Sequence, residues 1–113
     1  MAALARQLRR FAAERDWERF HSPKNLAMAL AVEAAELLEQ FQWLTEAESR
    51  APASDRRRRI EDELADVLIY LVRLADRLDV DLPAAVASKL EQNRQRYPAE
   101  RVRGSAAKYD EYE

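Results

Sequence analysis

Two pairs of acidic residues, each with its members three positions apart, lie inside apolar stretches of this 113-residue chain. They are Glu33-Ala-Ala-Glu36 and Glu63-Leu-Ala-Asp66, and residues 26–38 carry no charge other than the first pair. Residues three apart on a helix share one face, and carboxylates rarely leave water without a partner. We therefore expect two helices that each direct two carboxylates toward a common interior.

The composition agrees with an all-α fold. Ala, Leu, Arg and Glu dominate, and the one glycine is Gly104. The absence of cysteine excludes disulfides, thiolate-bound zinc and a cysteine nucleophile. It also fits a reducing compartment, and we expect a cytoplasmic protein.

Charge and hydropathy exclude two classes of partner. The formal net charge of −2 argues against a broad electrostatic grip on a nucleic acid polymer. No apolar run reaches the length of a membrane span, and no apolar signal core follows the N-terminal arginines. We expect neither a nucleic acid nor a membrane as partner.

Hydrophobic periodicity predicts four helices in one domain, 1–113, with a polar tail over 98–113. The first covers about 2–15, and the second, begun by Ser22-Pro23, runs to about 42. The third is capped by Ser54 or Asp55 and runs to about 78, and the fourth lies between Asp81 and Tyr97-Pro98. The second should be the most buried, since it is apolar on most sides. The loop 45–54 should hold one short turn, begun by a Thr45–Glu48 capping box. We predict a four-helix bundle.

The acid pairs indicate a metal site. Helices two and three can be antiparallel neighbours, which would bring the pairs to one level of the bundle. Clustered carboxylates raise each other's pKa values, and a hard divalent cation removes that repulsion. A di-iron bundle needs Glu-x-x-His motifs, but the one histidine is His21. Oxygen-only ligation favours Mg²⁺, or Mn²⁺, and Mg²⁺ usually bridges carboxylates to phosphates. A nucleotide polyphosphate is then the natural ligand.

Aromatic and polar residues could hold the rest of a nucleotide. A base could stack on aromatic side chains near helix ends and connections, namely Trp17, His21, Trp43 and Tyr70. On the fourth helix, Lys89 and Asn93 are candidates for the phosphates. Each could equally be an ordinary core or surface residue. With one glycine, a backbone phosphate cradle is not expected.

The order of these motifs resembles the all-α nucleoside triphosphate pyrophosphohydrolases, the MazG-like superfamily. The resemblance is closer still to its dCTP pyrophosphatase branch, and it covers nearly the whole chain. The segments that carry it beside the acid pairs are Phe11-Ala-Ala-Glu-Arg-Asp-Trp17-Glu-Arg-Phe-His21, Pro23-Lys-Asn-Leu26, Glu36-Leu-Leu-Glu-Gln-Phe-Gln-Trp43, Asp66-Val-Leu-Ile-Tyr70-Leu-Val72, Asp81-Leu-Pro83 and Asn93-Arg-Gln-Arg-Tyr97-Pro98.

The resemblance implies Mg²⁺-dependent hydrolysis of a nucleoside triphosphate, dCTP or a modified dCTP, to the monophosphate and pyrophosphate, in the service of nucleotide-pool sanitation. It implies that the catalytic metal ligands are Glu33, Glu36, Glu63 and Asp66. It places four residues at the base and sugar pocket, Trp17, His21, Trp43 and Tyr70, and two near the phosphates, Lys89 and Asn93. Members of the family are oligomers, often tetramers built as dimers of dimers.

Two alternatives stay open at this point. One is a pyrophosphohydrolase of broad specificity or for another base, and the other is a helical interaction module with solvated acids. The chain also departs from the family in one place. Relatives can carry a histidine in the first helix near the pocket, where this sequence reads Gln7-Leu8-Arg9-Arg10. We expect one nucleotide contact to be lost or replaced there.

Overall fold

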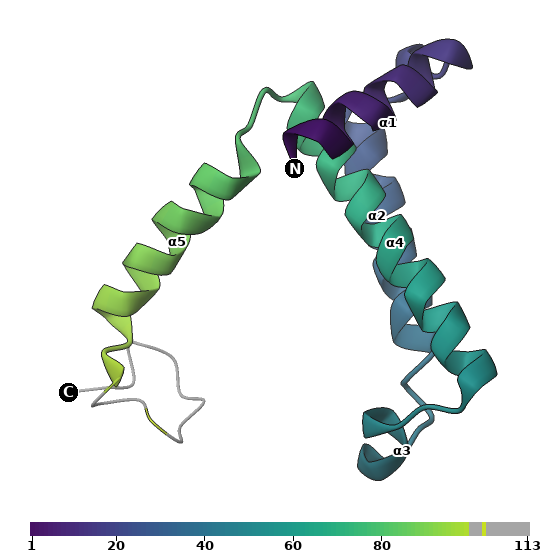
Figure 1. Ribbon diagram of the computed structural model, residues 1–113, viewed down its shortest axis with the longest axis vertical. Coiled ribbons are helices and arrows are strands. Elements are labelled where there is room, and N and C mark those ends of the chain that lie inside the picture. Colours follow the sequence, from purple (N-terminus) through teal and green to yellow (C-terminus); the bar gives the residue numbers. More distant parts are fainter. Residues whose placement is uncertain (100–102, 104–113) are drawn as a thin grey trace. The chain divides into compact units, whose positions relative to one another are not determined.

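The structure, a computed structural model, describes residues 1–99 and residue 103, and this part of the chain is helical without a strand (Figure 1). Its elements are α1 (Ala2–Glu14), a 3₁₀ turn (Glu18–Phe20), α2 (Pro23–Glu39), α3 (Glu46–Arg50), α4 (Ser54–Arg77) and α5 (Leu82–Arg96). The all-α class is confirmed, with five α-helices in the described residues where four were expected. None of these helices is long and apolar enough to cross a membrane.

The helix starts follow the capping residues with one exception. The Ser22 hydroxyl accepts the Asn25 N–H, and the Asp81 carboxylate accepts the Ala84 N–H, as the sequence indicates. The expected cap of the third long helix is wrong: the N-cap is Ala53, without a side-chain hydrogen bond. The carboxylate of Asp55 instead accepts the Arg56 N–H in the first turn.

The short helix α3 is the turn that the capping box predicts. The Thr45 hydroxyl accepts the Glu48 N–H at 3.2 Å, and the Glu48 carboxylate accepts the Thr45 N–H at 2.9 Å. These two bonds satisfy two backbone donors reciprocally. They also lower the pKa of Glu48. The segment is therefore an ordered turn and not an open loop.

Two helices end on an aspartate in the left-handed region, which a chain poor in glycine must use in place of glycine. Asp16 follows α1 with φ 55°, and Asp79 follows α4 with φ 54°. In each case the next residue closes the helix end, with Trp17 donating to the Ala12 carbonyl and Val80 to the Ala75 carbonyl. The first of these caps fixes the place of Trp17 beside α1.

The chain divides into two compact units, Met1–Val80 and Asp81–Glu113. In the first, α2 and α4 run side by side in opposite directions, and α1 packs on α4 (Figure 1). Its buried apolar residues are Ala12, Leu26, Ile60, Val72 and Ala75. The expectation that the second helix is the most buried is wrong within one chain. Only one residue of α2 is buried, whereas α4 buries four.

The second unit contains α5, which has no buried residue. Most of the expected polar tail, 98–113, lies outside the described residues. The single-domain organisation stays a prediction.

Candidate metal centre

The antiparallel pairing of α2 and α4 brings the acid pairs together, as the sequence predicts. One carboxylate oxygen from each of Glu33, Glu36 and Glu63 lies within 4.8 Å of the others. All three side chains are half-buried, and Asp66 is half-buried one turn after Glu63. The Oε2 atoms of Glu33 and Glu63 are buried, and neither has a hydrogen-bond partner in the described part of the chain.

This crowding changes the acidity of the cluster. Burial raises the pKa of Glu33 from 4.5 to about 7, and the nearby carboxylates of Glu36, Glu63 and Asp66 add to the increase. Burial also raises the pKa of Glu63, and the negative charges of Glu36 and Asp66 add to the increase. The pKa values of the two residues rise because like charges and lost solvent disfavour ionisation. Within the part of the chain that the structure describes, the ion pairs of arginine and lysine do not include Glu33 or Glu63.

The donor set fits a hard divalent cation. All the candidate ligand atoms are carboxylate oxygens, which suit Mg²⁺ and Mn²⁺. A cation would supply partners to the orphaned oxygens of Glu33 and Glu63, which are otherwise costly to bury. Exposed acids on amphipathic helices would show neither orphaned oxygens nor a raised pKa. These two features distinguish the cluster from acids on a fully solvated helix face.

Two of the four aromatic candidates form one group near the start of α2. Trp17 contacts the ring of His21 at 6.2 Å between centroids and meets Phe11 edge-on at 5.7 Å. Trp17 keeps 43% of its surface exposed. His21 is half-buried, and its backbone oxygen accepts a hydrogen bond from Arg77 Nε at 3.1 Å. A flat ligand could stack on the exposed part of this pair.

The other two candidates lie elsewhere on the helix pair. Trp43 follows the opposite end of α2 and is 87% exposed. The 17 residues of α2 separate Trp43 from His21 by about 25 Å of helix. Tyr70 is half-buried on α4, seven residues after Glu63. One copy of the chain therefore does not bring all four aromatic residues around a single base.

The phosphate candidates lie on α5 in the second unit. Lys89 is exposed and Asn93 is half-buried, one helical turn apart on the same face. The Asn93 carbonyl accepts the N–H of Tyr97 at the helix end. Their roles stay predictions.

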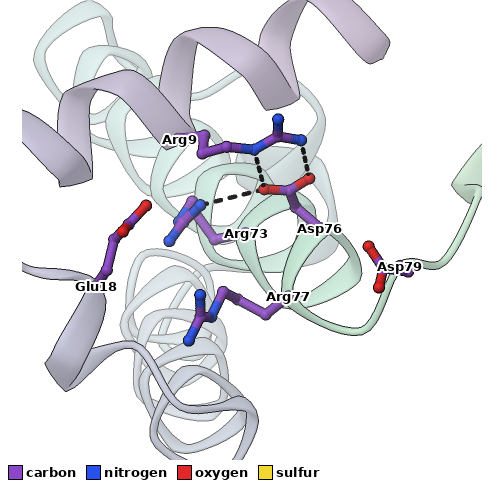
Figure 2. A pocket seen from close by; sticks show the side chains of 6 residues that line it. All are labelled: Arg9, Glu18, Arg73, Asp76, Arg77 and Asp79. Atoms are coloured by element: carbon purple, nitrogen blue, oxygen red, sulfur yellow. Dashed lines mark hydrogen bonds and ion pairs between the residues drawn. The ribbon is translucent and has the colours of Figure 1, made fainter.

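Sequence reasoning missed a second cluster, which surrounds an open hollow of about 340 Å³ (Figure 2). Its lining residues are Arg9, Glu18, Arg73, Asp76, Arg77 and Asp79. Arg9 holds the Asp76 carboxylate with two nitrogens, and Arg73 Nη1 donates to the same carboxylate at 3.3 Å. The hydrogen bonds from Arg9 first, and then the positive charges of Arg9, Arg73 and Arg77, lower the pKa of Asp76. The available signal was a single charge, Arg73, in the otherwise uncharged segment 67–75 of the third long helix.

Fold and site together define a class: an all-α protein with a carboxylate cluster suited to a divalent cation. The MazG-like family profile matches residues 28–112. The chain belongs to the MazG-like family.

Relatives carry names that agree with this class. The dCTP pyrophosphatase 1 of Rattus norvegicus is 57% identical over 101 residues, which cover 88% of this chain and 59% of the rat protein. The dCTP pyrophosphatase 1 of Homo sapiens is 55% identical over 103 residues, covering 89% of this chain and 61% of that protein. The chain thus spans about three fifths of these relatives' length.

A solved structure is similar over almost its full length. It is a pyrophosphatase from Archaeoglobus fulgidus with a TM-score of 0.82 and 42% identity, and the match covers 87% of this chain and 92% of that one.

Proposed function

We propose that this protein hydrolyses a nucleoside triphosphate, with dCTP or a modified dCTP as substrate, to the monophosphate and pyrophosphate. The observation that carries the proposal is the cluster of Glu33, Glu36 and Glu63, whose buried oxygens lack partners. An uncompensated group of acids calls for a cation, and Mg²⁺ in proteins commonly bridges carboxylates to phosphates. The similarity to dCTP pyrophosphatase 1 proteins supports the choice of substrate.

In this proposal, Mg²⁺, or Mn²⁺ in its place, is held by Glu33, Glu36, Glu63 and Asp66. When bound, it would lower the pKa of water and neutralise phosphate charge. The chain's own contribution is a set of oxygens gathered before the substrate arrives. The candidate base, Glu36, would take the proton of the water that attacks the α-phosphorus. Sanitation of the nucleotide pool and a cytoplasmic location belong to the same proposal.

The nucleoside would be held by Trp17, His21, Trp43 and Tyr70, and the phosphates by Lys89 and Asn93. Since Trp43 lies at the far end of α2 from His21, a complete pocket requires more than one copy of the chain. The family resemblance points to a tetramer built as a dimer of dimers. It also points to a four-helix bundle of the MazG-like type.

Exposed apolar stripes on both helices support an oligomer. On α2, Met28 and Val32 are 52% and 55% exposed at a spacing of four, and on α4 Leu64 and Leu68 repeat that spacing. Contiguous apolar surface of this kind usually marks an interface. Sedimentation equilibrium at micromolar concentration should therefore find an oligomer, and a folded monomer would contradict the proposal.

Steady-state kinetics on dCTP, 5-methyl-dCTP, dTTP, dATP and dGTP with Mg²⁺ tests the activity. We expect monophosphate and pyrophosphate as products, with kcat/KM highest for the cytosine nucleotides. Release of diphosphate and phosphate would place the cleaved bond elsewhere. Equal kcat/KM across the four unmodified substrates would remove the cytosine assignment and leave a general pyrophosphohydrolase. No turnover of any of them would favour a helical interaction module.

Loss of a base contact should affect all accepted nucleotides together. Trp43→Ala should raise KM for each of them, because stacking contributes about 1–3 kcal/mol per base and barely distinguishes bases. Phe20→Ala is the matched control, since Phe20 is also exposed (57%) but is not a pocket candidate. Equal KM values for wild type and Trp43→Ala would remove Trp43 from the pocket.

A further inference from the structure

The side chain of Arg73 is buried in an unusual setting. It is 3% exposed, against 54% for the Arg9 side chain in the same cluster. Nη1 of Arg73 donates to Asp76 at 3.3 Å, and Nη2 lies 3.5 Å from Nδ1 of His21. Its Nε is buried and has no partner in the described part of the chain. A buried guanidinium thus faces an imidazole nitrogen.

A guanidinium can only donate hydrogen bonds. The His21 Nδ1 that faces it must therefore be the acceptor, so the ring is neutral and carries its proton on Nε2. Protonation of Nδ1 would place two donors and two positive charges against each other. The charged groups that act on the ring are Arg73, Arg77 and Glu18, so two cations oppose one anion.

The rest of the cluster holds Arg73 in place. Asp76 compensates the charge of Arg73 and is itself gripped by two nitrogens of Arg9 from α1 (Figure 2). On α4, the helix that also carries Arg73, the Nε of Arg77 donates a hydrogen bond to the backbone oxygen of His21 at 3.1 Å. Ring and backbone of His21 are each held by a different arginine.

We propose that Arg73 is a positioning residue that keeps His21 neutral and presents its Nε2–H as a hydrogen-bond donor to an acceptor atom of the nucleoside. This inference deepens the proposed function and rests on it for the identity of the ligand. His21 then serves as an uncharged, directional donor beside the exposed face of Trp17. It does not act as a cation toward phosphate or as an imidazolium acid. The pKa of His21 is lowered, first by burial and then by the charges of Arg73 and Arg77, which agrees with a neutral ring.

The single histidine of the chain makes an unambiguous test possible by ¹⁵N-imidazole NMR of the intact protein. In wild type we expect an unprotonated Nδ1, a protonated Nε2 and a titration below the ordinary histidine pKa. Arg73→Met should raise that pKa and lose the tautomer preference, while Arg73→Lys, which keeps a charged donor, should retain both. A wild-type ring protonated on Nδ1, or an unchanged titration in Arg73→Met, would overturn the proposal.

Arg77→Met is the matched control. It removes the same charge from the same helix but only a contact to the His21 backbone. It should therefore leave the tautomer intact and raise the pKa less than Arg73→Met. An equal effect of both variants would mean that net charge alone acts on His21, which contradicts a specific ring contact. Thermal melting of the variants separates these effects from unfolding.

Kinetics then tests the link to substrate. Arg73→Met should raise KM about three- to ten-fold, as expected for loss of one neutral hydrogen bond, with a smaller change in kcat. Its KM should also acquire a pH dependence near the raised His21 pKa. An unchanged KM would overturn the role in nucleotide binding. If the wild-type protein hydrolyses none of the nucleotides, the proposed function is overturned. The NMR result would then still report the tautomer of His21.

Discussion

Two charged clusters lie against the same helix, and they are built in opposite ways. Around Glu63, the neighbouring groups Glu33, Glu36 and Asp66 are acidic, and two buried oxygens lack partners within the described residues. Around Arg73, ten residues and about 15 Å further along α4, Asp76 takes hydrogen bonds from two arginines. In the proposed function a cation completes the first cluster, whereas the second is largely satisfied by the chain itself.

This difference suggests different roles: the acid cluster is built as a ligand site, and the arginine cluster is built to stabilise the fold. A buried charge costs several kcal/mol unless it is paired, so clustered acids either take up protons, as the raised pKa of Glu33 indicates, or are compensated by a ligand from outside the chain. A paired set requires no ligand and can hold neighbouring groups in position. By this reasoning, removing a charge should relieve the acid cluster and damage the arginine cluster.

The largest expected effect is on catalysis in the acid cluster. Asp66→Asn or Glu36→Gln should lower kcat/KM by about 100-fold or more, because even residues that only support metal ligands account for 10–100-fold. Circular dichroism should show an intact helical fold. Without metal, either variant should melt no lower than wild type, because a repelling charge is gone. Glu39→Gln, on the exposed face of α2, should behave as wild type. Retained turnover in Asp66→Asn or Glu36→Gln would remove that residue from the ligand set.

The second effect is on stability in the arginine cluster. Asp76→Asn should lower the free energy of unfolding by about 3 kcal/mol, because it leaves Arg73 buried without its counter-charge. Chemical denaturation measures it. Asp16→Asn is the matched control, since Asp16 forms only an exposed ion pair with Arg19, and its effect should stay within about 0.5 kcal/mol. Equal effects of the two changes would mean that the Arg73 cluster is not a structural support.

The third effect is on the pH dependence of protein stability, to which the two clusters contribute with opposite signs. The pKa of Glu33 is higher in the folded chain, about 7, than its ordinary value of 4.5. The folded state then holds more protons between these values, so this group makes the metal-free protein less stable as pH rises from 4.5 to about 7. The pKa of Asp76 is lowered, so its contribution is present above 3.8 and is lost as pH falls below that value.

Melting curves of metal-free wild type and Glu33→Gln between pH 4.5 and 8 report the contribution of Glu33 together with that of Glu63, whose titration is linked to it. His21 and Asp76 titrate in both proteins, so their contributions cancel in the difference. We expect Glu33→Gln to gain stability relative to wild type as pH rises to about 7 and to hold that gain above it. A difference that does not vary with pH would show that Glu33 titrates normally. Added Mg²⁺ should stabilise wild type less at pH 5 than at pH 8, because protons compete for the same oxygens.

The smallest effect concerns the two aspartates with positive φ. Asp16→Gly should raise the free energy of unfolding by about 0.5 kcal/mol, because glycine adopts φ 55° without cost. Asp79→Gly should raise the free energy of unfolding by less, since this change also removes a negative charge that attracts Arg9. Denaturation of both variants checks the order. A larger gain at Asp79 would indicate that it contributes nothing to the arginine cluster.

The sequence by itself determined the helical class, most helix starts and the acid pairs. These are local properties: Ser22, Thr45 and Asp81 cap their own helices, and residues three apart share a face in any helix. It failed at Ala53, where no side-chain cap is formed, and in ranking α2 as the most buried helix. Apolar residues such as Met28 and Val32 give the same pattern whether they are covered or exposed.

Only the tertiary structure decided which distant residues meet. Antiparallel pairing of α2 with α4 sets Glu33 against Glu63, and that pairing was anticipated because the two long helices can be antiparallel neighbours. The packing of α1 on α4 brings Arg9 to Asp76 across 67 positions of sequence, and the turn before α2 brings His21 to Arg73. Such contacts depend on the angle and register of helix packing, which are fixed by side-chain fit over the whole unit and leave no local pattern in the sequence.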